Sequence, residues 1–67
     1  MHDLLSPTAR RWLTTKQAAA YLGCSAALLE KDRWSRLLGI PFSRLGRHIR
    51  YDMLALDEYL ERNKQGA

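Results

Sequence analysis

Residues 13–25 read LTTKQAAAYLGCS, and this stretch contains the signals for two helices joined by a short turn. Thr14 and Gln17 stand at the spacing of a capping box. In that motif the threonine hydroxyl and the glutamine side chain each accept a hydrogen bond from the other residue's backbone N–H. The spacing predicts a helix over about 15–22.

The turn between the two helices is expected to be short. Gly23 follows the last apolar pair of the first helix, and glycine readily takes the left-handed conformation that ends many helices. Ser25 is a favourable N-cap for the second helix. A turn of about three residues holds two helices at a steep angle, which is the helix-turn-helix arrangement.

The end of the second helix is set by its hydrophobic pattern. A straight helix over 26–38 would have apolar side chains all round its axis. We therefore expect the helix to end between Arg33 and Arg36. Leu37 and Leu38 are expected to pack against the domain after a change of direction.

The spacing of apolar residues then changes to two, which is typical of strands. A three-residue connection at 46–48 would pair Leu45 with Ile49 and Ser43 with Tyr51, and would place all four on one face. We prefer this register to a two-residue turn because it lets Leu45 and Ile49 be buried together. It also places Arg44 opposite Arg50 on the outer face of a two-stranded wing.

Asp52 is placed to cap a last helix over about 53–63, which we interpret as a structural brace. The predicted fold class is therefore mainly α with a two-stranded β wing, a winged helix-turn-helix. The expected organisation is an N-terminal arm over 1–12, a DNA-binding domain over 13–63 and a C-terminal tail over 64–67.

Charge is distributed unevenly along the 67 residues, whose formal net charge is +4. Residues 31–51 contain six Lys or Arg and one Asp, a net charge of +5, whereas the residues after them are net acidic. A concentrated positive field attracts a polyanion, and nucleic acid is the commonest one in a cytoplasm. A solvated charged surface without a partner is the alternative interpretation.

Size and composition argue against several classes of protein. A chain this short has one small core and no room for a deep substrate cleft, so we expect no enzyme and no small-molecule substrate. Cys24, the single cysteine, forms no metal-ligand spacing with His2 or His48, and we expect neither metal nor cofactor. No apolar run reaches membrane-spanning length, which predicts a cytoplasmic protein without a membrane partner.

Over residues 13–63 the sequence resembles the excisionase and AlpA-like group of small MerR-type winged helix-turn-helix proteins of prophages and integrative elements. The resemblance rests on LTTKQAAAYLGCS and on PFSRLGRHIRYDMLALDEYL, which begins at Pro41. Asp32 departs from the pattern, since an apolar residue that faces the core is usual there. Either Asp32 pairs with Arg33 or another base, or the helix has ended by that point.

The resemblance implies a recombination directionality factor. Such proteins bind double-stranded DNA beside an attachment site, often cooperatively with further copies, bend it, and help a tyrosine recombinase to excise the element. One alternative is a transcription regulator of the same elements. Another is a module that binds the integrase or a second copy through an apolar patch of Trp12, Trp34, Leu37 and Leu38.

The candidate DNA-binding residues fall into three groups. The second helix fits the major groove, and its side chains away from the core can reach base edges. Wing cations suit a minor groove or phosphates, and the start of the first helix offers hydroxyl and N–H donors to a phosphate. The recognition-helix group is Ser25, Ala26, Ala27, Glu30, Lys31 and Trp34; the wing group is Arg44, Arg47, His48 and Arg50; the first-helix group is Thr14, Thr15 and Lys16.

Two of these residues have a second interpretation. Glu30 either accepts a hydrogen bond from a cytosine amino group or neutralises a nearby basic side chain such as Lys31. Trp34 either faces the DNA or belongs to the core. Arg47, His48, Arg50 and Tyr51 superficially suggest recombinase chemistry, but a single strand cannot bring four side chains so close in sequence to one phosphate. Tyr51 is also predicted to face inward.

Overall fold

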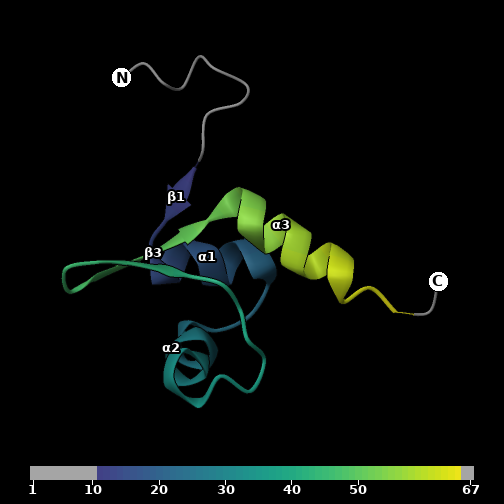
Figure 1. Ribbon diagram of the computed structural model, residues 1–67, viewed down its shortest axis with the longest axis horizontal. Helices are drawn as coiled ribbons and strands as arrows, with labels where there is room; N and C mark the ends of the chain where they lie inside the picture. The colour runs from purple at the N-terminus through teal and green to yellow at the C-terminus, as the bar shows by residue number, and fades with distance from the viewer. Residues whose placement is uncertain (1–10, 66–67) are drawn as a thin grey trace.

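The computed structural model describes residues 11–65, which form three helices and a three-stranded antiparallel sheet (Figure 1). The winged helix-turn-helix predicted from the sequence is confirmed, with one more strand than expected. In chain order the elements are β1 (Trp12–Leu13), α1 (Thr15–Leu22), α2 (Ala26–Ser35), β2 (Ser43–Leu45), β3 (His48–Asp52) and α3 (Met53–Arg62).

The caps predicted around the turn are all present. The Thr14 hydroxyl accepts from the Gln17 N–H at 3.2 Å, and the Gln17 side chain accepts from the Thr14 N–H at 3.0 Å. Gly23 ends α1 in the left-handed conformation, with φ of 76°. Ser25 caps α2 by accepting from the Leu28 N–H at 3.1 Å. The turn is short because Gly23 ends α1 and Ser25, two residues later, caps the start of α2.

Helix α2 ends at Ser35, inside the predicted window, and Arg36 caps it in the left-handed conformation with φ of 56°. The expectation that Leu37 and Leu38 pack after this point was wrong. Leu37 is 84% exposed and Leu38 is 44% exposed. The chain does change direction, but the residue that enters the core after the turn is Ile40.

Asp32 is the buried group that organises this turn. Its carboxylate accepts from the backbone N–H groups of Leu38 at 2.6 Å, Gly39 at 3.3 Å and Ile40 at 2.9 Å. Burial by itself raises the pKa of Asp32, but the three N–H donors and the Arg36 guanidinium outweigh it and lower the pKa. Of the two alternatives given for Asp32, the helix does not end there, since α2 continues to Ser35, and the carboxylate binds backbone N–H groups, with Arg36 contributing a nearby positive charge.

The predicted register of the wing was wrong. A two-residue turn at Gly46 and Arg47 joins β2 to β3, so Arg44 does not lie opposite Arg50. Burial does not set the register, because Leu45 is 71% exposed. Gly46 has φ of 62°, and glycine in this conformation at the first central position suits a tight hairpin. The observed pairs are Ser43 with Arg50, Arg44 with Ile49 and Leu45 with His48.

The strand missed by the sequence reasoning is β1. It pairs antiparallel with β3, so the sheet order is β1-β3-β2 and the predicted two-stranded wing is part of a three-stranded sheet. Trp12, assigned to the arm, pairs with Asp52, and Leu13 pairs with Tyr51. A strand of two residues has no alternation that a sequence pattern could reveal. Residues 1–10 of the predicted arm lie outside the described residues.

The core is small and lies where the helices meet the sheet. Tyr51 fills its centre from β3 at 1% exposure, as its predicted inward orientation requires. Helix α3 is capped by Asp52 and braces the rest, since Tyr59 donates to the Leu38 carbonyl at 2.9 Å and Tyr21 of α1 donates to Asp57. The buried apolar residues are Ala18, Ala19, Leu29, Ile40, Tyr51 and Leu56.

Candidate nucleic-acid interface

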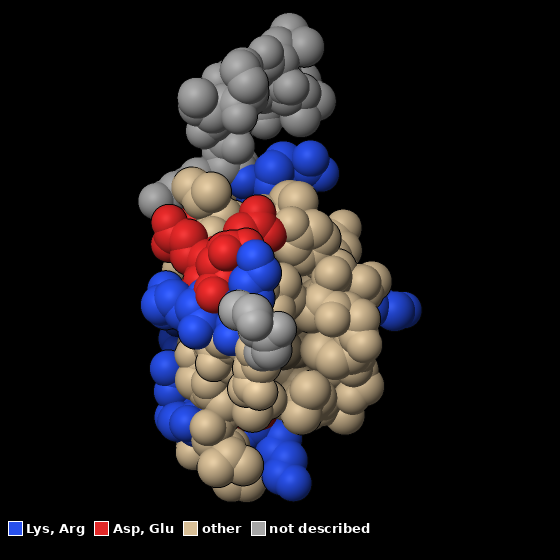
Figure 2. Space-filling model, turned by 90° about the vertical axis from the view of Figure 1, so that its right-hand side faces the viewer, with Lys and Arg blue, Asp and Glu red and all other residues tan. Residues whose placement is uncertain are grey.

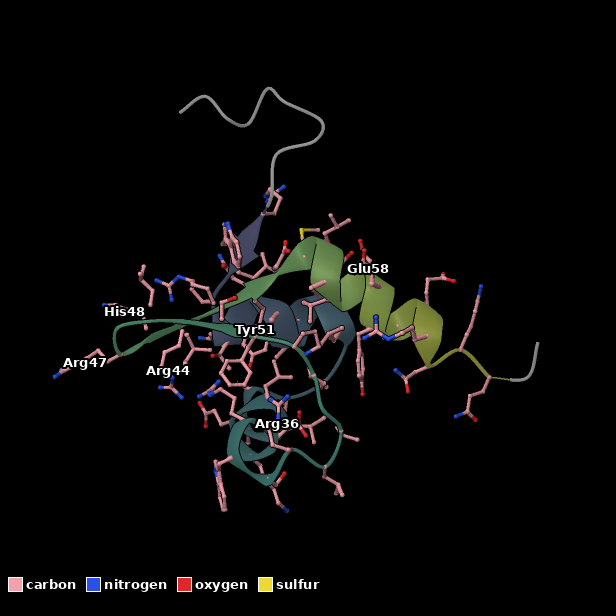
Figure 3. The ribbon with its side chains drawn as sticks, viewed as in Figure 1. Arg36, Arg44, Arg47, His48, Tyr51 and Glu58 are labelled. Atoms are coloured by element: carbon pink, nitrogen blue, oxygen red, sulfur yellow. The ribbon has the colours of Figure 1, made fainter. Side chains whose placement is uncertain are left out.

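An open depression of about 450 Å³ lies between the start of α1, the first turns of α2 and the wing. Eight of its nine lining residues come from the three predicted DNA-binding groups, so these groups, scattered in sequence, meet on one surface. Arg47 and His48 stand at the outer tip of the wing (Figure 3). The lining residues are Thr14, Thr15, Lys16, Ala26, Glu30, Arg47, His48, Ile49 and Arg50.

Helix α2 presents an exposed stripe opposite its buried side. Leu29 and Asp32 face the core, and at 100° per residue Ala27, Glu30 and Trp34 lie on the far side of the helix. Trp34 is 80% exposed, so the interpretation of Trp34 as a core residue was wrong. The stripe carries the side chains that a groove could contact, with the exposed Lys31 beside it and the exposed Ser25 at its start.

The wing cations do not share one environment. Arg47 and His48 are exposed, whereas Arg50 is half-buried and donates to the Ile49 carbonyl at 2.8 Å. Arg44 lines a separate hollow of about 420 Å³ on the wing, together with Trp12 and Leu45. Arg50 borders both hollows, and Arg44 borders only the second.

The hydroxyl groups at the start of α1 already have internal partners. Thr14 accepts from the Gln17 N–H, and Thr15 accepts from Arg33 Nη1 at 3.0 Å. Each hydroxyl keeps its own proton as a donor, and the N–H groups of the first helical turn have no partner within the helix. Lys16 is exposed beside them. This end of α1 can therefore donate to an anion in the depression.

Two basic residues of the positive segment have structural contacts that the sequence did not reveal. Arg33 is half-buried, and its Nη1 donates to the Tyr51 hydroxyl at 3.1 Å as well as to Thr15. Arg36 lies over the Phe42 ring, 5.5 Å from its centroid. No sequence signal identifies either contact, because the partners of Arg33 lie 18 residues away on other elements and Phe42 follows a change of chain direction after α2. The net charge of residues 31–51 therefore overstates what is free to meet phosphates.

The acidic side chains of α3 gather away from the wing. Figure 2 shows them in one cluster on the side of the molecule where the chain ends. Asp57, Glu58 and Glu61 of α3 are all exposed, and Figure 3 shows Glu58 on α3, well away from Arg47. The depression beside the wing is lined by Lys16, Arg47 and Arg50 against the single carboxylate of Glu30, so a polyanion is favoured there.

The structure also bears on the other kinds of site weighed from the sequence. Within residues 11–65, no group of three His, Cys, Asp or Glu side chains is placed to hold a metal ion, and no helix is long and apolar enough to cross a membrane. Arg47 and His48 project outward while Tyr51 is buried, so these side chains do not converge. In Figure 1, β1 and α2, the elements that contain Trp12 and Trp34, lie on opposite sides of α1.

These features define a small winged helix-turn-helix protein. Comparison with family models gives a match over residues 12–64 to the family described as "Helix-turn-helix domain". The chain belongs to this family, whose members are typically non-enzymatic DNA-binding proteins, and membership indicates DNA binding. Neither the curated proteins nor the solved structures contain a match to the chain.

Proposed function

We propose that the chain binds duplex DNA with α2 in the major groove and the wing tip against the adjacent minor groove or its phosphates. The observation that carries this proposal is the shared depression, where the start of α1, the start of α2 and the wing border one surface. A helix and a basic hairpin side by side can engage a groove and the neighbouring backbone together.

Within this activity, we propose the role of an excisionase in a bacterial cytoplasm. The chain would bind beside an attachment site, bend the DNA and promote excision of a prophage or integrative element by a tyrosine recombinase. The resemblance over residues 13–63 supports this role, and the matched family includes AlpA- and excisionase-like proteins. A single copy offers a small footprint, so specificity would come from cooperative binding of copies side by side.

Substitution of the wing-tip arginine tests the DNA-binding proposal. We expect Arg47→Ala to weaken binding to duplex DNA by roughly three- to tenfold at moderate salt and to reduce the salt slope by about 0.9, the value for one lost phosphate contact. Fluorescence anisotropy with a labelled duplex enriched from a random pool, hereafter the selected duplex, measures both.

The matched control is Arg62→Ala, which removes the same charge from the exposed end of α3. It should keep wild-type affinity beyond a small general effect of net charge. Equal affinities for the wild type and Arg47→Ala would refute the role of the wing. Equal losses in the two variants would mean that net charge alone, without a defined interface, governs binding.

A further inference from the structure

Arg33 stands at the junction of the three elements that build the proposed interface. It belongs to the third turn of α2, and its side chain points to the inner side of that helix, half-buried. One nitrogen, Nη1, donates to Thr15 at the start of α1 and to Tyr51 in β3. The same guanidinium therefore ties α2 to the helix before it and to the wing strand.

The Tyr51 end of this link is rigid. Tyr51 is 1% exposed, pairs with Leu13 in the sheet, and its ring lies 6.2 Å from that of Phe42. Figure 3 shows its side chain pointing from β3 toward α2. Its hydroxyl oxygen is therefore held in place as an acceptor. Along β3, Tyr51 comes two positions after Ile49, which lines the depression. A hydrogen bond to that oxygen fixes α2 relative to the part of β3 that leads to the wing tip.

The Thr15 end is equally close to the depression. Thr15 is the first residue of α1 and is itself a lining residue. A planar guanidinium holds two acceptors in a defined geometry, which a flexible ammonium group does not do. Interfaces require their contacting groups to be held in place by a supporting layer of hydrogen bonds, because small displacements lose several contacts at once.

We propose that Arg33 is a positioning residue that sets the orientation of α2 relative to the wing, so that both reach one DNA site together. This inference rests on the proposed DNA binding and assigns Arg33 an internal role in place of a phosphate contact. It predicts that loss of the Arg33 hydrogen bonds weakens binding to the selected duplex, where α2 and the wing must contact their sites at the same time. Binding to random duplex depends mainly on phosphate charge and should be spared.

The sharpest variant is Tyr51→Phe, which removes one hydroxyl and keeps the buried ring. We expect about tenfold weaker binding to the selected duplex, unchanged binding to a random duplex within about twofold, and an unchanged salt slope. The matched control is Tyr21→Phe, which removes the hydroxyl that donates to Asp57 between α1 and α3. This control should keep the wild-type ratio of selected to random affinity.

Two further variants separate positioning from charge. Arg33→Lys keeps the charge and should lose selected-duplex affinity as Tyr51→Phe does, whereas Arg33→Met removes both the charge and the link. Residual dipolar couplings of the free protein should show a changed angle between α2 and β3 in Tyr51→Phe and no change in Tyr21→Phe.

The outcomes are distinguishable. If wild-type protein binds no duplex at any salt concentration, the proposed function and this inference both fail. If the wild type binds but Tyr51→Phe keeps the selected-to-random affinity ratio and the wild-type angle between α2 and β3, only the positioning role fails. It also fails if Arg33→Met reduces binding to both duplexes equally and lowers the salt slope by about 0.9, because Arg33 would then be a phosphate contact.

Discussion

Replacement of Asp32 by alanine is expected to destabilise the domain by about 3 kcal/mol, the largest effect of any single substitution considered for this chain. Asp32 is 3% exposed and accepts from three consecutive backbone N–H groups. Each buried N–H group that loses its partner costs about 1–3 kcal/mol, and partial access of water to the loop limits the sum. Thermal unfolding followed by circular dichroism should show a melting temperature lower by roughly 12–24 °C.

Glu58→Ala is the matched control, because it removes an exposed carboxylate from α3 and should change stability by no more than about 0.5 kcal/mol. Asp32→Asn retains one acceptor oxygen and should fall between wild type and alanine. A melting temperature of Asp32→Ala within a few degrees of wild type would show that this carboxylate does not hold the loop.

The same hydrogen bonds give the sign of the pH dependence. They lower the pKa of Asp32 in the folded protein below its ordinary value despite the opposing effect of burial. The contribution of the charged carboxylate to stability is therefore complete above about pH 4 and is lost as the pH falls through the folded-state pKa. The stability difference between wild type and Asp32→Asn should shrink in that acid range. A constant difference would contradict the assignment.

Replacement of Trp34 by alanine is expected to have the opposite profile, with little effect on folding and a large effect on DNA binding. Trp34 is 80% exposed on the stripe of α2 that includes Glu30, and alanine is a good helix former. We expect stability within about 0.5 kcal/mol of wild type. Affinity for the selected duplex should fall by about 1.5–2 kcal/mol, or roughly 10–30-fold, as for an aromatic side chain that is buried on binding.

Leu37→Ala provides the comparison, since Leu37 is equally exposed and apolar but lies beyond the end of α2. It should bind the selected duplex as wild type does. Anisotropy titrations and thermal unfolding of both variants check the prediction. Unchanged affinity together with a melting temperature several degrees lower for Trp34→Ala would restore the interpretation of Trp34 as a packing residue.

Local signals were read correctly from the sequence because they act between residues three or four apart. The capping box of Thr14 and Gln17, the glycine that ends α1 and the Ser25 cap each depend on side chains close in the chain. They locate both helices and the turn between them. Tyr51 was also placed correctly, because the alternation along its strand distinguishes the inner face.

Contacts between distant segments were the ones that sequence reasoning missed. The wing register was predicted from the burial of Leu45, which is in fact exposed. The pairing of Trp12 with Asp52 and the link from Arg33 to Tyr51 join elements far apart in the chain. Asp32 was recognised as unusual, but the backbone N–H groups that donate to its carboxylate lie in a turn whose geometry appears only after the chain has folded.

In the candidate site, too, the sequence predicted which residues take part better than it predicted their contacts. The candidate residues were chosen by charge and by position on predicted elements, and eight of these residues line one depression. Arg44 was included as a wing cation suited to a phosphate, and it borders a different hollow. Arg33 shows why charge alone is an incomplete guide, since its guanidinium forms internal hydrogen bonds that no count of basic residues reveals.

The most direct measurement is an NMR titration of the uniformly labelled protein with the selected duplex. Binding through the helix and wing predicts the largest amide shift changes at Lys16, from Ala26 to Trp34, and at Arg47 and His48, with α3 beyond Leu56 little affected. Changes confined to α3, or none at all at low salt, would contradict the claim that this winged helix-turn-helix binds DNA through that surface.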